Sequence, residues 1–441
     1  MADTDTIAAI ATPPGVGGVG IVRVSGPEAE NIASKLTGGV PAPRRAVLVK
    51  ITDSGGAAID SGLAIHFPAP HSFTGESVLE LHGHGGPVVL SMILDAVLGA
   101  GARRAEPGEF SRRAFENGKL DLAQAEAVAD LIESGSRRAA RSALRSLSGA
   151  FSDDVHALVE QLTRIRIFVE AAIDFPEEEI NFLSDEALSR QLDDGRVAFD
   201  QLLDRTRAGR VLRDGFQAVI AGKPNAGKSS LMNALSGDET AIVTDMAGTT
   251  RDVLRETIVI EGLTIELVDT AGLREEAGLV EQEGIRRARK AMSSADAVLW
   301  VLDSTEPDPG APEEEEDAAL LVVRNKIDLS GEPAGQNADG SIGVSAVTME
   351  GFEALKAALL TLAGLDTGIE GAFSARARHI EAIENARAHF EQGVAALRDA
   401  RAGELLAEEL RLAQDDLGTI TGELHSDDLL GRIFADFCIG K

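Results

Sequence analysis

The chain is poor in the features that mark secreted and membrane-spanning proteins. It has one cysteine, Cys438, so no disulfide can form within the chain, and a reducing cytoplasm is the expected setting. No run of residues approaches the roughly 18 consecutive apolar positions that a membrane helix needs. The first fifteen residues lack the basic and apolar regions of an export signal. We therefore expect a cytoplasmic protein without a membrane span.

Basic residues are also scarce, because 42 Lys and Arg stand against 72 Asp and Glu, which gives a formal charge of −30. This balance argues against a general nucleic-acid binder, since phosphate backbones attract basic surfaces. If the substrate is RNA, a local basic patch or a partner protein must supply the contacts. The pair Arg112-Arg113 is one candidate for contact with such an RNA or a partner, and simple solvation is its alternative. The acidic run Glu313 to Asp317 is interpreted as a solvated loop.

The first 118 residues alternate short β-rich runs with Gly and Pro. Val19 to Gly26, residues 63–67 and Val78 to Gly86 are typical of strands, and residues 28–36 and 88–98 have helical spacing. This pattern predicts a compact α+β domain over residues 1–118.

From about Asp121 the apolar residues recur at steps of three and four, as helices require. Breaks are expected near Gly149 and Pro176, and helical spacing returns over residues 375–437. Between these stretches, strand and helix patterns alternate. The predicted fold class is therefore multidomain. An α+β N-terminal domain is followed by an α-helical domain in two parts, residues 119–212 and 369–441, which flank an inserted α/β domain at 213–368.

The most specific motif is GKPNAGKS, Gly222 to Ser229, which fits the phosphate-loop pattern G-x-x-x-x-G-K-[ST]. It follows a buried strand pattern and precedes a helix. Gly222 and Gly227 let backbone N–H groups converge on phosphates, and the helix N-terminus adds a favourable dipole. Lys228 is expected to reach the β- and γ-phosphates, and the Ser229 hydroxyl to coordinate Mg²⁺.

Three further motifs follow in order, AGTTRD, DTAG and NKID, each expected at a strand end. Thr250 is placed to complete the Mg²⁺ shell when a γ-phosphate is present. Asp269 would hold the metal through water, and the Gly272 N–H would sense the γ-phosphate. Asp328 can accept hydrogen bonds from N1–H and the 2-amino group of guanine, which specifies GTP over ATP. Ser345-Ala346 fits a base-contacting loop.

Together the motifs predict a protein that binds and hydrolyses GTP. The predicted nucleotide-binding residues are Asn225, Ala226, Gly227, Lys228, Ser229, Ser230, Thr244, Asp245, Met246, Ala247, Gly248, Thr249, Thr250, Asp269, Thr270, Ala271, Gly272, Asn325, Lys326, Asp328, Ser345 and Ala346.

The water-positioning glutamine that many GTPases carry after the DxxG glycine is absent. Leu273 stands there and cannot orient water. Four glutamates lie just downstream, and on the residues alone any of them could position the attacking water: Glu275, Glu276, Glu281 and Glu283.

With these pieces in place, the chain resembles the tRNA-modification GTPase family MnmE/TrmE over essentially its whole length. Three signatures outside the GTPase motifs carry the resemblance: ATPPGVGGVGIVRVSG (Ala11 to Gly26), NGKLDLAQAEAVADLI (Asn117 to Ile132) and FCIGK (Phe437 to Lys441).

The resemblance implies a folate site in the N-terminal domain. In the family this domain is similar to the tetrahydrofolate-binding part of the glycine-cleavage aminomethyltransferase, dimerises, and binds 5-formyl- or 5,10-methylene-tetrahydrofolate near the interface. The implied contacts are Arg23, Glu80, Lys119 and Lys441. Basic side chains could hold the glutamate-tail carboxylates, and Glu80 could hydrogen-bond the pterin ring.

The resemblance also implies potassium-dependent hydrolysis. Asn225 matches the family's K⁺ ligand, the carbonyls near Thr244, Met246 and Thr249 match its potassium loop, and Glu281 matches its catalytic glutamate. The cation would stand where other GTPases place an arginine finger.

The implied reaction adds a carboxymethylaminomethyl or aminomethyl group to carbon 5 of the tRNA wobble uridine. The implied partner is the FAD- and NADH-using protein MnmG, also called GidA, which would carry most of the RNA surface in a hetero-oligomer with the homodimer. Folate would supply one carbon.

Several alternatives stay open at this point. A ribosome-assembly GTPase or a self-assembling scaffold GTPase would share parts of the pattern. Cys438 could be a catalytic thiol or a small buried hydrophobe. Glu80, His82 and His84 share one strand face, which could bind a metal or form the wall of a ligand pocket.

Overall fold

The computed structural model of the 441-residue chain describes residues 5–174, 186–238, 255–269, 295–306, 319–365, 372–423, 427–435, 437 and 440. The chain divides into two compact units. The first comprises Met1–Ala129, Leu147–His156 and Gln414–Lys441, and the second Asp130–Ser146 and Ala157–Ala413. Within the described ranges, no helix is both long and apolar enough to cross a membrane.

The first unit contains a six-stranded sheet with the order β3-β4-β5-β2-β1-β6. All neighbours are antiparallel except β1 and β6. Its strands are β1 (Ile7–Ile10), β2 (Gly17–Ser25), β3 (Val47–Thr52), β4 (Ala58–Phe67), β5 (Val78–Gly85) and β6 (Arg103–Arg104). The helices α1 (Ala29–Thr37) and α2 (Pro87–Gly99) pack on this sheet and bury its apolar face.

The register of β2 and β5 positions polar residues opposite the core. Val22 pairs with Leu81, and both side chains are fully buried. Arg23 pairs with Glu80 one position along. Because successive side chains of a strand point to opposite faces, Arg23 and Glu80 lie on the face away from this core.

The C-terminal segment completes the first unit. The helices α3 (Glu109–Glu116), α4 (Leu122–Glu133) and α14 (Asp427–Ala435) surround a cluster in which Leu122 and Ala125 meet Phe434 and Phe437. A Cβ at Gly108 would stand 2.6 Å from the Phe434 carbonyl oxygen, so this close approach of α3 and α14 requires glycine.

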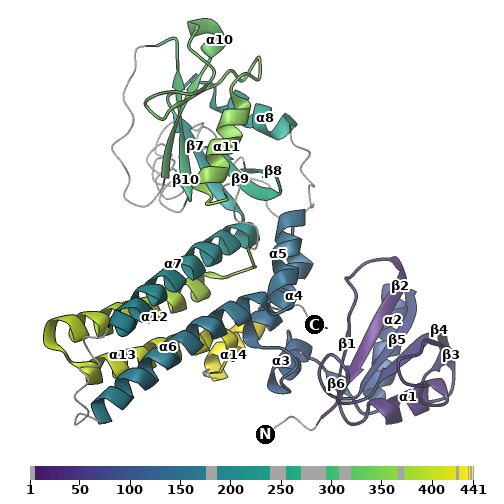
Figure 1. The fold of residues 1–441 in the computed structure, drawn as a ribbon. Helices are drawn as coiled ribbons and strands as arrows, with labels where there is room; N and C mark the ends of the chain where they lie inside the picture. Colours follow the sequence, from purple (N-terminus) through teal and green to yellow (C-terminus); the bar gives the residue numbers. More distant parts are fainter. Residues whose placement is uncertain are drawn as a thin grey trace, which may run out of the picture. The chain divides into compact units, whose positions relative to one another are not determined.

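The second unit contains a seven-stranded sheet with the order β12-β13-β11-β10-β7-β9-β8 (Figure 1). The central strands are parallel, and antiparallel pairs close both edges. Its strands are β7 (Phe216–Gly222), β8 (Arg255–Ile260), β9 (Leu263–Asp269), β10 (Ala297–Asp303), β11 (Ala319–Asn325), β12 (Gly335–Gln336) and β13 (Ile342–Gly343). The helices beside it are α8 (Lys228–Asp238), α10 (Ile327–Ser330) and α11 (Phe352–Leu362).

Long helices precede and follow this α/β domain. They are α5 (Arg137–Leu147), α6 (Ala150–Asp174), α7 (Glu186–Asp214), α12 (Ala377–Ala400) and α13 (Gly403–Thr421). The helices α7 and α12 lie side by side in Figure 1, with the rings of Phe199 and Phe390 5.4 Å apart between centroids. Only Gly215 separates the end of α7 from the start of β7, so the chain passes directly from this helix into the α/β domain.

The predicted fold class is confirmed, with an α/β domain inserted between two helical stretches. At one edge of its sheet, the short strand β12 pairs with β13. The helix break expected at Pro176 lies outside the described residues.

Candidate functional site

The phosphate loop lies where β7 ends and α8 begins. Gly222 and Gly227 have φ angles of 143° and 91°, and Asn225 has a φ of 66°, so three positions of the loop adopt left-handed backbone. A Cβ at Gly222 would lie 2.3 Å from the Val301 carbonyl oxygen, and one at Gly227 would lie 2.2 Å from the Asn325 amide nitrogen. The loop therefore requires glycine at both positions.

Lys228 begins α8 and its side chain turns back across the loop. Its Nζ donates hydrogen bonds to the carbonyl oxygens of Gly222 at 3.1 Å and Lys223 at 2.8 Å. Lys228 is 8% exposed, whereas Ser229 and Ser230 in the same helical turn are exposed. A lysine inside a glycine-rich loop at a helix N-terminus, with hydroxyl groups beside it, is suited to bind a nucleoside triphosphate and Mg²⁺.

Asn325 connects the phosphate loop to the loop after β13. Its Nδ2 donates to the Ala226 carbonyl oxygen at 3.0 Å, and its Oδ1 accepts from the Ala346 N–H at 3.2 Å. Because Asn325 is 2% exposed, these bonds are shielded from water. Three motifs that are separate in the sequence thus meet at one edge of the sheet. Ser345 is buried, and its Oγ accepts from the N–H groups of Val347 and Thr348.

Lys326 supplies a second connection to the phosphate loop. Its Nζ donates to the Asn225 carbonyl oxygen at 2.8 Å and to Asp303 Oδ2 at 2.5 Å. Burial alone would raise the pKa of Asp303, but hydrogen bonds from Lys326 and Thr305 outweigh it and lower the pKa to about 2. The carboxylate is therefore ionised at neutral pH and holds Lys326 against the loop. Asp303 is not among the residues predicted from the sequence, and the available signal was a polar residue at the end of a buried strand.

Asp328 lies in the first turn of α10 and is exposed. It makes no hydrogen bond or ion pair with the part of the chain that the structure describes. Its carboxylate is therefore available to accept hydrogen bonds from a guanine base beside the anchored Asn325-Lys326 pair.

Part of the predicted nucleotide site falls outside the described residues. These positions are Thr244, Asp245, Met246, Ala247, Gly248, Thr249, Thr250, Thr270, Ala271, Gly272 and Glu281, together with the side chain of Asp269. The other candidate glutamates, Leu273, Cys438, Lys441 and the acidic run 313–317 also lie outside them. Asp269 ends β9, which is parallel to β7, so the backbone of the DTAG motif begins at the same sheet edge as the phosphate loop.

The predicted folate residues Arg23 and Glu80 are paired across β2 and β5. Arg23 Nε donates to Glu80 Oε1 at 3.0 Å, and His82 Nε2 lies 3.1 Å from Glu80 Oε2. The Arg23 guanidinium lies 5.8 Å from the ring centroids of Phe73 and Phe110. Charged groups beside an aromatic surface suit a ligand that has both a flat ring and carboxylates.

Of the remaining folate candidates, Lys119 lies among the described residues and Lys441 lies outside them. Asn117 Nδ2 donates to the Thr74 carbonyl oxygen at 2.8 Å, and the exposed Lys119 follows two residues later. A Cβ at Gly75 would lie 3.4 Å from Lys119 Cγ, so Lys119 borders the segment that carries Phe73. Gly440, the residue before Lys441, is buried, and a Cβ there would lie 2.4 Å from the Ile10 carbonyl oxygen.

The alternating Glu80, His82 and His84 do not form a metal site among the described residues, where no cluster of three metal-ligating side chains occurs. His84 Nδ1 lies 2.8 Å from Asp60 Oδ1, whereas His82 contacts Glu80. The polar residues of this strand therefore form two separate pairs, Glu80 with His82 and His84 with Asp60.

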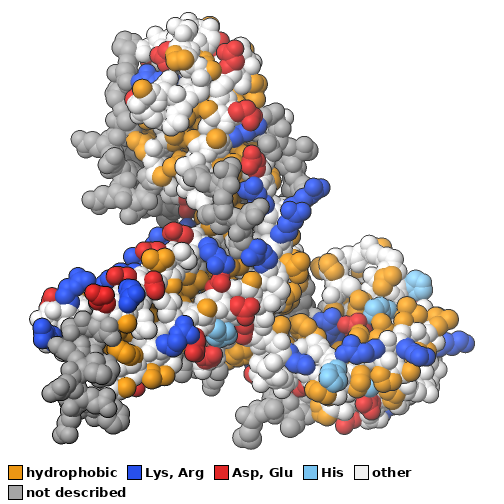
Figure 2. Space-filling view, viewed as in Figure 1, with side chains coloured by type: hydrophobic (Ala, Val, Ile, Leu, Met, Phe, Trp, Pro, Cys, Tyr) orange, Lys and Arg blue, Asp and Glu red, His pale blue; other side chains and the backbone are white. Residues whose placement is uncertain are grey.

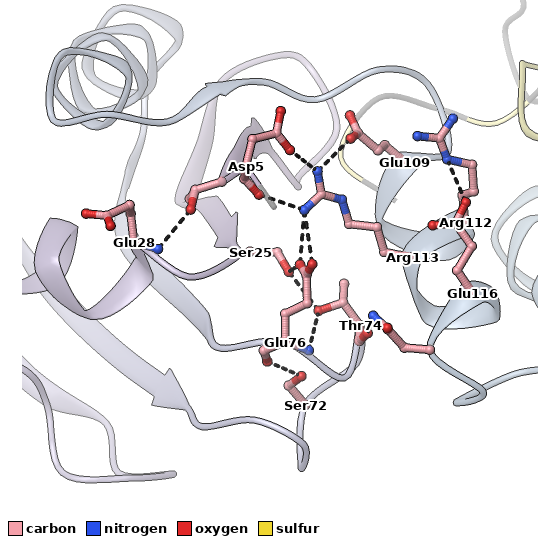
Figure 3. Close-up of polar contacts among 12 residues, drawn as sticks. Asp5, Ser25, Glu28, Ser72, Thr74, Glu76, Glu109, Arg112, Arg113 and Glu116 are labelled. Carbon is pink, nitrogen blue, oxygen red and sulfur yellow. Dashed lines mark hydrogen bonds and ion pairs between the residues drawn. The ribbon is translucent and has the colours of Figure 1, made fainter. Parts of the chain in front are cut away.

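The prediction that Arg113 is available to tRNA or solvent is wrong. Its side chain is 2% exposed and donates to Asp5 Oδ1 at 2.7 Å, Glu109 Oε1 at 2.9 Å and Glu76 Oε1 at 3.1 Å (Figure 3). Three carboxylates thus surround one guanidinium inside the first unit. The neighbouring Arg112 is partly exposed and lies 3.5 Å from Glu116.

Comparison with known proteins identifies two matching families. Residues 6–119 match the family described as GTP-binding protein TrmE N-terminus, and residues 122–438 match the MnmE helical domain.

Several solved structures are also similar. The G domain of the T. maritima FeoB iron transporter is 25% identical and covers 34% of this chain and 98% of its own, with a TM-score of 0.25. Translation elongation factor SelB from Methanococcus maripaludis is 18% identical over 34% and 33%, with a TM-score of 0.23. A GTP-binding protein from Sulfolobus solfataricus in complex with GDP is 15% identical over 63% and 77%, with a TM-score of 0.23.

Proposed function

Because the chain belongs to the MnmE/TrmE family of tRNA-modification GTPases, it is a GTP hydrolase, and we propose that its hydrolysis depends on potassium and serves wobble-uridine modification. In this proposal, the chain acts in the cytoplasm as a homodimer with an FAD-dependent partner of the MnmG/GidA type. The product carries a carboxymethylaminomethyl or aminomethyl group at carbon 5 of the uridine. The observation that carries the proposal is the match to the TrmE N-terminus over residues 6–119 and to the MnmE helical domain over residues 122–438.

The proposed nucleotide chemistry uses the loop edge of the second unit's sheet. The backbone between Gly222 and Lys228 binds the phosphates, and Ser229 and Thr250 hold Mg²⁺. Asp328 reads the guanine base. Asn225 and the carbonyls of residues 244–249 hold K⁺, which adds positive charge where negative charge develops during hydrolysis. The bonds from Asn325 and Lys326 to this loop support the proposal, because they fix the backbone that must meet the phosphates.

The proposed folate chemistry uses the first unit. Arg23, Lys119 and Lys441 hold the carboxylates of the glutamate tail, and Glu80 accepts a hydrogen bond from the pterin ring. When bound, the folate supplies one carbon for the modification. The ion pair between Arg23 and Glu80 beside Phe73 supports this assignment, because it places acidic, basic and aromatic groups together. We assign residues 1–118 to folate binding and dimerisation, 213–368 to GTP hydrolysis, and 119–212 with 369–441 to the helical domain.

The deciding experiment is nucleoside mass spectrometry of bulk tRNA from cells with and without the gene. Loss of the modified wobble uridines on deletion, with recovery by the wild-type chain and no recovery by Lys228→Ala, is the expected result. An unchanged nucleoside profile on deletion would overturn the proposal. A parallel titration of 5-formyl-tetrahydrofolate into the full chain should show binding that Arg23→Ala weakens, with the exposed Arg104→Ala as the control.

A further inference from the structure

The helix α5 is strongly basic in a chain whose overall charge is −30. Its sequence, RRAARSALRSL, contains four arginines and no acidic residue. Ala139, Ser142, Ala143 and Ser146 form its buried face. Arg137, Arg141 and Arg145, called here the α5 arginine row, are all exposed and follow one another at intervals of four residues. Figure 2 shows Lys and Arg side chains gathered over this helix.

This composition is unfavourable for the helix itself. Arg137 begins the helix, where the positive end of the helix dipole disfavours cations. Arg137 and Arg141, and again Arg141 and Arg145, are like charges at i,i+4, which destabilise a helix. Arg137 and Arg141 make no ion pair with the described residues. Helix stability therefore does not account for Arg137 and Arg141.

Hydrogen bonds at both ends of α5 fix the helix that carries the row. Ser136 Oγ accepts a hydrogen bond from the Ala139 N–H at 3.1 Å, which caps the helix, and donates to the Gly262 carbonyl oxygen at 2.6 Å. At the other end, Ser146 Oγ donates to the Ser374 carbonyl oxygen at 2.9 Å, and the Ser374 N–H donates to the Ser142 carbonyl oxygen at 3.2 Å. The small inner residues let α5 approach this segment closely.

We propose that the α5 arginine row binds the phosphate backbone of tRNA. Residues four apart on a helix are separated by about 6 Å along its axis, so the row presents a line of guanidinium groups to a line of phosphates. Arginine binds phosphate with paired N–H donors. The inference rests on the proposed function, which makes tRNA the polyanion this protein must approach. The α5 arginine row gives this acidic chain a basic surface for contact with tRNA.

The test measures binding of bulk tRNA to the full chain over a series of salt concentrations. Arg137→Gln/Arg141→Gln should bind about tenfold more weakly at low salt, and the slope of log K against log[salt] should become shallower by about 1.5 to 2. Arg190→Gln/Arg398→Gln is the matched control, because both arginines are exposed on α7 and α12 and the charge change is the same. Arg137→Lys/Arg141→Lys should retain most of the affinity and the slope.

Thermal melting separates loss of binding from loss of structure. The double glutamine variant should melt no lower than wild type, since it removes repulsion within α5. Glutamine and control variants with equal affinities and equal slopes would overturn the proposal, as would a preference of the row for an acidic protein over tRNA. The nucleoside profile after gene deletion does not depend on α5, so this proposal and the proposed function can fail separately.

Discussion

The carboxylate of Asp130 accepts a hydrogen bond from Arg213 Nε at 2.8 Å, although 83 residues separate the two in sequence. The same carboxylate accepts from Arg376 Nη2 at 2.9 Å and from Ser374 Oγ at 2.6 Å. Arg213 is the penultimate residue of α7 and begins the inserted GTPase domain, and Ser374 and Arg376 follow that domain. One buried side chain thus holds both connections of the inserted domain.

Removing this carboxylate should destabilise the second unit. The Asp130 side chain is 4% exposed, and Asp130→Ala removes a carboxylate that two partly buried guanidinium groups share. We expect a loss of about 2–4 kcal/mol in the free energy of unfolding, measured by urea denaturation. Asp193→Ala, at an exposed ion pair, is the control and should cost less than about 1 kcal/mol. Equal effects of the two substitutions would contradict the structural role of Asp130.

Asp328→Asn should change the base that the protein prefers. The substitution replaces an acceptor-only carboxylate by an amide, so one of two hydrogen bonds to guanine is lost. GTP affinity should fall about 100-fold, and xanthosine triphosphate, which carries a carbonyl in place of the 2-amino group, should bind better than GTP. Titrations with GTP and xanthosine triphosphate measure the two affinities, with Ser330→Ala as the control. Unchanged GTP affinity would remove Asp328 from the base site.

Potassium dependence should be lost when the Asn225 side chain is removed. GTP turnover of the wild-type chain should be at least about tenfold faster in potassium than in sodium buffer, because K⁺ offsets developing charge. Asn225→Gly preserves the left-handed backbone at φ 66° and removes the ligand. This variant should turn over slowly and equally in both salts. A wild-type chain with equal rates in both salts would disprove the potassium site.

Glu281→Ala should lower GTP turnover about 100-fold with near-normal nucleotide affinity, since a residue that positions water acts on the reaction rather than on binding. Single-turnover rates and affinities of the alanine variants at positions 275, 276 and 283 provide the comparison. If Glu281→Ala hydrolyses GTP normally, the variant that does not will identify the catalytic glutamate.

The network around Arg113 should make the stability of the first unit pH-dependent. Burial alone would raise the pKa values of Asp5 and Glu109, but hydrogen bonds from Arg103 and Arg113 outweigh burial and lower both. Carboxylates with lowered folded pKa values contribute stability that is fully present above their ordinary values. That contribution is lost as the pH falls through the lowered ones.

Arg113→Met should therefore cost about 3 kcal/mol at pH 7, because it removes one of the two guanidinium groups that neutralise the carboxylates of Asp5 and the buried Glu109. The difference from wild type should shrink as the pH falls below about 4, where those carboxylates become protonated. Urea denaturation across pH measures it, with the exposed Arg164→Met as the control. A cost that does not vary with pH would show that lost packing, not charge, dominates.

The sequence by itself determined the features that depend on local backbone. Gly222 and Gly227 belong to the motif that predicted a phosphate loop. The structure gives the physical reason, because a Cβ at either position would clash with Val301 or Asn325. The alternation of Glu80, His82 and His84 predicted that these three residues share one face of a strand. The net charge of −30 showed that RNA contact requires a local basic patch or a partner, but not where a patch lies.

Only the tertiary structure decided which charged residues form buried ion pairs and which are exposed. Arg113 was chosen from its sequence neighbourhood, yet Asp5, 108 positions away, helps to bury it. The sequence did not predict the exposed arginines of α5. Their exposure depends on the packing of Ser142 and Ser146 against Ser374, more than 200 residues later. Ion pairs and hydrogen bonds form between groups that are close in space. Their distance along the chain therefore does not predict which groups will pair.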